Sequence, residues 1–148
     1  MASIDTVDSI EIRADARRIF DTILDYPHIH TWFSQYRCRL LDEGASSVRE
    51  GSRVAHAVGR PAMTHFVRTV RRIVPGERIE ETYDEGDLHG TGTWTFEQNG
   101  PMTKVSFFCA VEARSLATKL GFALSGAWSH NLVYKLLLRA LKKRCETA

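Results

Sequence analysis

The sequence lacks the features that mark secreted, membrane-spanning or disulfide-stabilised proteins. Its three cysteines are odd in number and far apart, which favours free thiols in a reducing compartment. The opening MASIDTVDSIEI has no basic region followed by an apolar core, so we expect no signal peptide and a cytoplasmic protein. The longest apolar stretch is interrupted by Lys119, His130 and Lys135, which argues against a membrane span.

The sequence also has little net charge and no recognisable metal motif. A net charge of +2 gives no reason to expect nucleic acid or an anionic membrane as a partner. No Cys-x-x-Cys, His-Glu-x-x-His or nucleotide-binding glycine loop occurs, so we expect neither a metal nor another cofactor. His28 and His30 lie in a proline-led turn, where exposed histidines are common.

The stretch from Ser115 to Arg144 contains no proline, and its apolar residues recur at spacings of three, four and seven. This period is typical of one helical face, and a helix over the whole stretch would extend about 45 Å. The residues on this face are Leu116, Leu120, Ala123, Ala127, Tyr134, Leu138 and Leu141. A helix of such length needs a large apolar surface against which to pack.

The rest of the chain predicts short strands and an early helix. Residues 6–13 alternate as a strand, and residues 16–24 have the spacing of an amphipathic helix with Asp15 at its start and Pro27 as its stop. Residues 27–34 predict a second short helix. From Tyr36 the apolar period changes to two, and turn residues separate strands at about 36–43, 52–58, 64–74, 78–84, 89–97 and 103–113.

The predicted order is therefore strand, two short helices, six strands and a long helix. Short links between the strands favour antiparallel neighbours. The sequence thus predicts an α+β fold in which a curved sheet of about seven strands packs on a long C-terminal helix. We expect residues 1–148 to form one domain, because the length suits a single core. The pattern does not distinguish a monomer from a homodimer.

Three segments resemble a known superfamily. IEIRADARRIFDTILDYPHIHTWF is similar to the opening of the START-related, polyketide-cyclase and lipid-transfer superfamily (SRPBCC). DLHGTGTWTFEQNGPMTKVSF resembles its paired late strands, and AWSHNLVYKLLLRALKK resembles the last helix of a polyketide cyclase/dehydrase-like branch. The resemblance implies the helix-grip (START-like) fold and an apolar or aromatic ligand, such as a lipid, polyketide or isoprenoid, between sheet and helix.

A curved sheet cannot touch a straight helix along its whole length, so we expect a cavity between them. The small residues at 121–127 favour this interpretation, because each of the two glycines costs a helix about 1 kcal/mol relative to alanine. Strand parity and helical phase give the candidate wall residues Trp32, Val67, Tyr83, Trp94, Phe107, Cys109, Ala123, Ala127 and Asn131. Most of them have the plain alternative of core packing, but Asn131 interrupts an apolar face and needs a partner.

Two further candidates are polar. Glu81 belongs to an acidic group with Glu80, Asp84, Glu85 and Asp87, which predicts the solvated end of a hairpin. The alternative is that Glu81, which shares a strand face with Tyr83, points inward opposite Arg68 or Arg71 as an anchor for a ligand. His65 stands at the start of a strand and is a candidate general base if it faces inward, because an unperturbed histidine titrates near pH 6.5.

Three functions remain open from the sequence. The first is a protein that binds a hydrophobic small molecule. The second is a cyclase or dehydratase in which His65, Tyr83 or Glu81 moves a proton. The third is an interaction module that contacts a macromolecule through the basic end of the last helix and the Trp32 segment.

Overall fold

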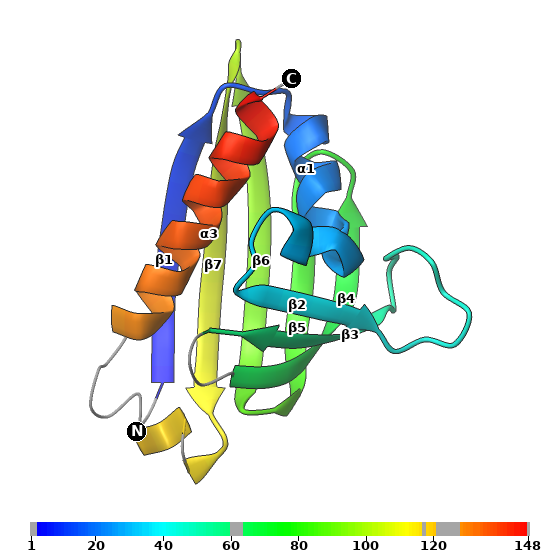
Figure 1. Cartoon of the computed structure of the whole chain (residues 1–148), viewed down its shortest axis with the longest axis vertical. Coiled ribbons are helices and arrows are strands. Elements are labelled where there is room, and N and C mark those ends of the chain that lie inside the picture. The colour runs from blue at the N-terminus through cyan, green and yellow to red at the C-terminus, as the bar shows by residue number, and fades with distance from the viewer. Residues whose placement is uncertain (1–2, 60–63, 117, 121–127, 148) are drawn as a thin grey trace.

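The computed structural model describes residues 3–59, 64–116, 118–120 and 128–147. One antiparallel sheet of seven strands has the order β1-β7-β6-β5-β4-β3-β2. The helices α1 and α3 pack on one face of this sheet, with α3 running across β1 (Figure 1). The predicted α+β arrangement of a curved antiparallel sheet and a C-terminal helix is confirmed. Among the described residues, no helix is both long and apolar enough to cross a membrane.

The elements follow the predicted order closely. They are β1 (Ser3–Ile12), α1 (Ala16–Leu24), the 3-10 helix η1 (Tyr26–Thr31), β2 (Tyr36–Leu40), β3 (Arg53–Val58), β4 (Thr64–Val74), β5 (Arg78–Gly86), β6 (Leu88–Asn99), β7 (Met102–Ala113) and α3 (Trp128–Glu146).

The early helix α1 buries the apolar face that its sequence spacing predicts. Its residues Ala16, Ile19, Phe20 and Ile23 are buried, and Asp15 is the N-cap residue. The Asp15 side chain makes no capping hydrogen bond. Instead, the backbone N–H of Ala16 donates to Oε1 of Gln98 at 3.0 Å, so a residue of β6 satisfies the first turn.

The C-terminal segment differs from the prediction at its N-terminal end. In α3, Tyr134, Leu138 and Leu141 are buried as expected. Leu116 and Leu120, however, are 83% and 59% exposed, so their predicted place in the core is wrong. The helical residues around Leu120 lie beside the end of β7 and out of line with α3 (Figure 1), which leaves Leu116 and Leu120 exposed. The small-residue stretch 121–127 lies outside the described residues.

The strand β4 has its predicted bounds but the opposite parity. Phe66, Arg68 and Val70 are buried on the inward face, whereas His65 is exposed and Val67 is half-buried. The prediction that Val67 lines the interior is therefore wrong, and His65 does not face inward as a general base or ligand contact there would require. Each face of this strand carries both apolar and polar residues, so alternation alone does not decide between them. Burying Phe66 covers the larger apolar side chain, and this places Arg68 in the interior.

Candidate functional site

The interior beneath the sheet's inward face contains a buried charged pair. Arg68 of β4 is 1% exposed, and its Nε lies 2.8 Å from Oε2 of Glu81 on β5. The prediction that Glu81 belongs to a solvated hairpin end is therefore wrong, and the inward alternative holds with Arg68 as the partner, while Arg71 is exposed and pairs with Asp84 on the outer face. Moving two charges out of water is costly, so further partners are needed to hold them inside.

Three tyrosines and the aromatic walls supply those partners. Arg68 donates from Nη1 to the Tyr83 hydroxyl at 3.3 Å and from Nη2 to the Tyr36 hydroxyl at 3.1 Å. The Tyr26 hydroxyl donates to Oε1 of Glu81. The guanidinium also lies 5.4 Å from the ring centre of Tyr26 and 5.3 Å from that of Tyr83, within cation–π range. The ion pair is therefore enclosed by hydrogen-bonding and aromatic groups.

His56 of β3 completes this cluster. It is 2% exposed, and its Nε2 accepts a hydrogen bond from Arg68 Nε at 3.2 Å. The proton of the neutral ring is therefore assigned to Nδ1, which lies 2.8 Å from the Tyr36 hydroxyl. Burial, together with the charge of Arg68, holds the pKa of His56 well below 6.5. The imidazole is consequently neutral near pH 7.

The tyrosines and Cys109 of the cluster also favour their neutral forms, whereas Glu81 stays paired with the charge of Arg68. Burial raises the pKa of Tyr26, Tyr36 and Tyr83 well above 10, although Arg68 lowers it in each case. Burial likewise raises the pKa of Glu81, against the opposing effects of Arg68 and Tyr26. It raises the pKa of Cys109, whose Sγ lies 3.6 Å from the Tyr83 hydroxyl, to about 11. These groups supply hydroxyl and thiol donors to the interior.

Four buried polar atoms have no hydrogen-bond partner within the described part of the chain: Thr6 Oγ1, Asp8 Oδ2, Glu81 Oε2 and Trp94 Nε1. Glu81 Oε2 belongs to this set despite its ion pair, because the Nε–H of Arg68 makes its hydrogen bond with His56. Buried polar groups are nearly always satisfied in native proteins, so four together call for a reason.

The register of the sheet brings these four atoms into two neighbouring cross-strand rows. One row contains Thr6, Cys109, Gly92 and Glu81, and the next contains Asp8, Phe107, Trp94 and Ile79. Gly92 leaves the first row without a side chain between Cys109 and Glu81. A Cβ atom there would lie only 3.1 Å from Phe107 Cζ and 3.2 Å from Tyr83 Cε1, so the two rings need the glycine.

The structure brings several of the sequence-predicted site residues together on this inward face. Tyr83, Trp94, Phe107 and Cys109 are each at most 2% exposed. The rings of Trp94 and Phe107 lie 4.5 Å apart, and Phe107 stacks on Tyr134 of α3 at 4.6 Å. Ala123, Ala127 and the side chain of Asn131 lie outside the described residues.

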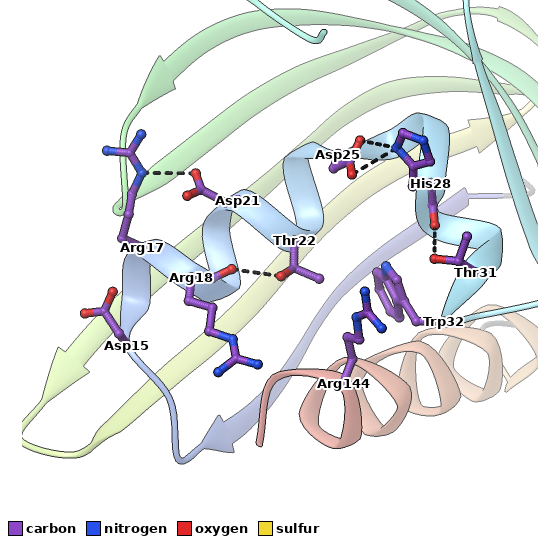
Figure 2. Close-up of a pocket in the computed structure, with 10 residues that line it drawn as sticks. All are labelled: Asp15, Arg17, Arg18, Asp21, Thr22, Asp25, His28, Thr31, Trp32 and Arg144. Atoms are coloured by element: carbon purple, nitrogen blue, oxygen red, sulfur yellow. Dashed lines mark hydrogen bonds and ion pairs between the residues drawn. The ribbon is translucent and has the colours of Figure 1, made fainter. Parts of the chain in front are cut away.

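Trp32 lies elsewhere, at an outer groove of about 490 Å³ between α1, η1 and the end of α3. Figure 2 shows Arg144 of α3 beside it in this groove. The walls are mostly charged and partly neutralise one another: Arg17 pairs with Asp21 at 3.0 Å, and His28 with Asp25 at 2.9 Å. Trp32 packs against the core from this side and is not one of the inward polar residues. The groove is therefore a weaker candidate than the interior.

Sequence reasoning missed five residues of the interior: Thr6, Asp8, Tyr26, Tyr36 and His56. A signal for two of them was present. His56 shares its strand face with Val54 and Val58, and Asp8 lies on the same face as Ile4 and Ile12. A polar residue that interrupts an apolar face was the criterion that selected Asn131. Across the described residues, no three His, Cys, Asp or Glu side chains gather as a metal site requires.

Comparison with known proteins identifies the family of this chain and its fold. The family described as polyketide cyclase / dehydrase and lipid transport matches residues 3–146. The chain belongs to this family. Its fold is the helix-grip fold of the START/SRPBCC superfamily, as the solved structures confirm. No curated protein matches the sequence.

Three solved structures illustrate the likeness. The protein TTHA0849 from Thermus thermophilus is 14% identical with a TM-score of 0.79, and the match covers 96% of this chain and 97% of that one. A START superfamily protein from Mycobacterium smegmatis is 18% identical with a TM-score of 0.72 and the same coverage. The Zhui aromatase/cyclase from a Streptomyces species is 13% identical with a TM-score of 0.70, and 96% of each chain is covered. At these identities the likeness concerns the fold alone.

Proposed function

We propose that residues 1–148 form one ligand-binding domain, which holds an apolar or aromatic small molecule bearing oxygen groups against the inward face of the sheet, beneath α3. The observation that carries this proposal is the gathering, in two neighbouring rows, of four buried polar atoms without a hydrogen-bond partner within the described part of the chain, of which Glu81 Oε2 has an ion pair with Arg68. Each such group costs the folded protein about 1–3 kcal/mol. A ligand that supplies hydrogen-bond partners for these atoms offsets this cost. Atoms without partners that were scattered over the molecule could not be satisfied by a single ligand.

The surroundings of these atoms favour an aromatic or polycyclic ligand. The ring of Phe107 stacks on Tyr134 and lies tilted against Trp94, and aromatic rings gain further free energy from offset-stacked or edge-to-face contact with another ring. Apolar burial contributes about 25 cal/mol per Å² to affinity, while the few polar atoms fix orientation. The family description, with its lipid and polyketide members, agrees with this class of ligand.

Native mass spectrometry of protein purified without denaturation tests the proposal directly. We expect an adduct that organic extraction removes, or a raised melting temperature with at least one of oleic acid, farnesol and 1-naphthol. Trp94→Phe should weaken binding severalfold, because it removes the unpartnered indole N–H and keeps an aromatic ring. Trp32→Phe, at the outer groove, is the matched control and should leave binding unchanged. A protein that is always empty and responds to none of the three compounds would refute the proposal.

A second candidate function is a cyclase or dehydratase. It is favoured by the neutral His56, which lies between Arg68 and the Tyr36 hydroxyl and could exchange a proton through that hydroxyl. The extracted compound distinguishes the two functions. Conversion by the wild-type protein and not by His56→Gln would support the enzyme, and recovery of the unchanged compound would support binding alone.

A further inference from the structure

Asp8 is a buried acidic residue at the edge of the sheet that the Arg68 cluster does not use. It lies on the inward face of β1, is 8% exposed, and its Oδ2 has no hydrogen-bond partner among the described residues. Thr6, two residues earlier on the same face, has an equally unpartnered Oγ1. The positive charge that lowers the pKa of Asp8 is that of Lys135 on α3. The Lys135 side chain is exposed and forms no ion pair with Asp8 in the described chain.

This end of β1 is continuous with the candidate site. Thr6 lies opposite Cys109 in the register, and Asp8 lies opposite Phe107. Cys109 contacts the Tyr83 hydroxyl, which in turn accepts a hydrogen bond from Arg68. Three strand spacings separate β1 from β5, or about 14 Å along the sheet. The inward face thus has a polar group at each end and aromatic rings between them.

The two ends differ in chemistry. The Arg68 end offers a guanidinium and tyrosine hydroxyls, which suit an oxygen that accepts hydrogen bonds. The β1 end offers a carboxylate, which accepts hydrogen bonds only, and a threonine hydroxyl. Burial raises the pKa of Asp8, so ionisation there is costly and a donated hydrogen bond is correspondingly favourable.

Building on the function proposed above, we infer that Asp8, with Thr6, selects a ligand that carries a hydrogen-bond donor, such as a phenol, an alcohol or an amine, at the end remote from Arg68. A fatty acid whose carboxylate entered this end would meet Asp8 and be repelled. A hydrocarbon would leave Asp8 without a partner. The inference narrows the ligand to a molecule with an apolar body and at least one donor group.

Paired probes of nearly equal shape test this inference. Isothermal titration calorimetry with 1-naphthol and 1-methylnaphthalene compares a hydroxyl with a methyl group on the same ring system. We expect the wild-type protein to prefer 1-naphthol by about tenfold or more, since a hydrogen bond to a charged group is worth about one to two decades of affinity. Asp8→Leu should abolish the preference, and Asp8→Asn should reduce it. Asp5→Asn is the matched control, because Asp5 is exposed on the opposite face of β1 and its loss should change nothing.

The possible results separate the inference from the function on which it rests. If wild-type protein binds both probes equally, or if the preference survives in the Asp8 variants, the inference is wrong while ligand binding stands. If neither probe binds but the protein carries another ligand or responds to oleic acid or farnesol, the inference alone is wrong; if it is also always empty and responds to none of these compounds, the proposed function fails as well. Thermal unfolding gives a readout that needs no ligand: Asp8→Leu should raise the melting temperature, because an unpartnered buried carboxylate is removed. A lower melting temperature would show that Lys135 or another group already satisfies Asp8, and it would overturn the inference.

Discussion

Removal of one member of the Arg68–Glu81 pair should destabilise the protein more than any surface substitution. The two side chains are only 2% and 0% exposed, so Arg68→Met would leave the Glu81 carboxylate buried without its cation. Breaking a pair of this kind costs about 3–5 kcal/mol, which is a large share of the roughly 5–15 kcal/mol that stabilises a typical domain. The tyrosine hydroxyls at 3.1 and 3.3 Å lose a donor as well.

Urea unfolding at pH 7, followed by circular dichroism, measures this loss. The double variant Arg68→Met/Glu81→Gln removes both charges and keeps an acceptor for Tyr26, so it should recover at least about 2 kcal/mol relative to the sum of the single changes. Arg71→Met is the matched control, because Arg71 is 56% exposed and its pair with Asp84 is worth at most about 1 kcal/mol. A loss below about 1 kcal/mol for Arg68→Met, or strict additivity in the double variant, would refute the view of a coupled buried pair.

Two other predictions concern titratable groups of the interior. Folding lowers the pKa of His56, so the contribution of the neutral imidazole to stability is present above pH 6.5 and is lost as the pH falls toward the pKa of the folded state. His56→Gln should therefore flatten the decrease in unfolding free energy below about pH 6.5. An unchanged slope would contradict the assignment of His56 as a buried neutral group. Burial raises the pKa of Cys38, Cys109 and Cys145, so the three thiols should react slowly with Ellman's reagent at pH 8 in the folded protein and fast after unfolding. A rapid reaction of Cys109 in the folded protein would contradict its place in the interior.

The sequence was most informative where one apolar period runs through a whole element. The spacing of α1 predicted its buried face, and the alternation of β5 predicted that Glu81 and Tyr83 share one strand face. These predictions succeed because each depends on the geometry of a single helix or strand and on the choice of the more apolar face.

Predictions that depend on neighbouring strands succeeded less well. His65 and Phe66 offered two possible faces for β4, and contact between Phe66 and the His56 ring, stacked at 5.1 Å, decides the matter through a strand that is distant in sequence. β4 also shifts register against β5 between Val67 and Arg68, an irregularity that alternation does not reveal. Leu116 and Leu120 matched a helical period that continues into α3, yet only tertiary structure shows that their segment lies beside the end of β7.

The candidate site was harder to predict than the fold, because its members come from all seven strands. The candidate site extends from Tyr36 of β2 to Asp8 of β1, the strands at the two opposite edges of the sheet. Only the cross-strand register shows that Thr6 and Asp8 stand in the same rows as Glu81 and Trp94. Polar residues inside apolar strand faces were visible in the sequence, but their convergence was not.

The indole N–H of Trp94 offers the most direct test of ligand binding in the interior. Proton–nitrogen NMR spectra of the labelled protein, assigned with Trp32→Phe and Trp94→Phe, would be recorded before and after addition of 1-naphthol. We predict a large downfield shift of the Trp94 indole resonance, as its unpartnered N–H acquires an acceptor, and little change for Trp32. An unmoved Trp94 resonance at saturating 1-naphthol, with a shift confined to Trp32, would place binding at the outer groove and contradict an interior site.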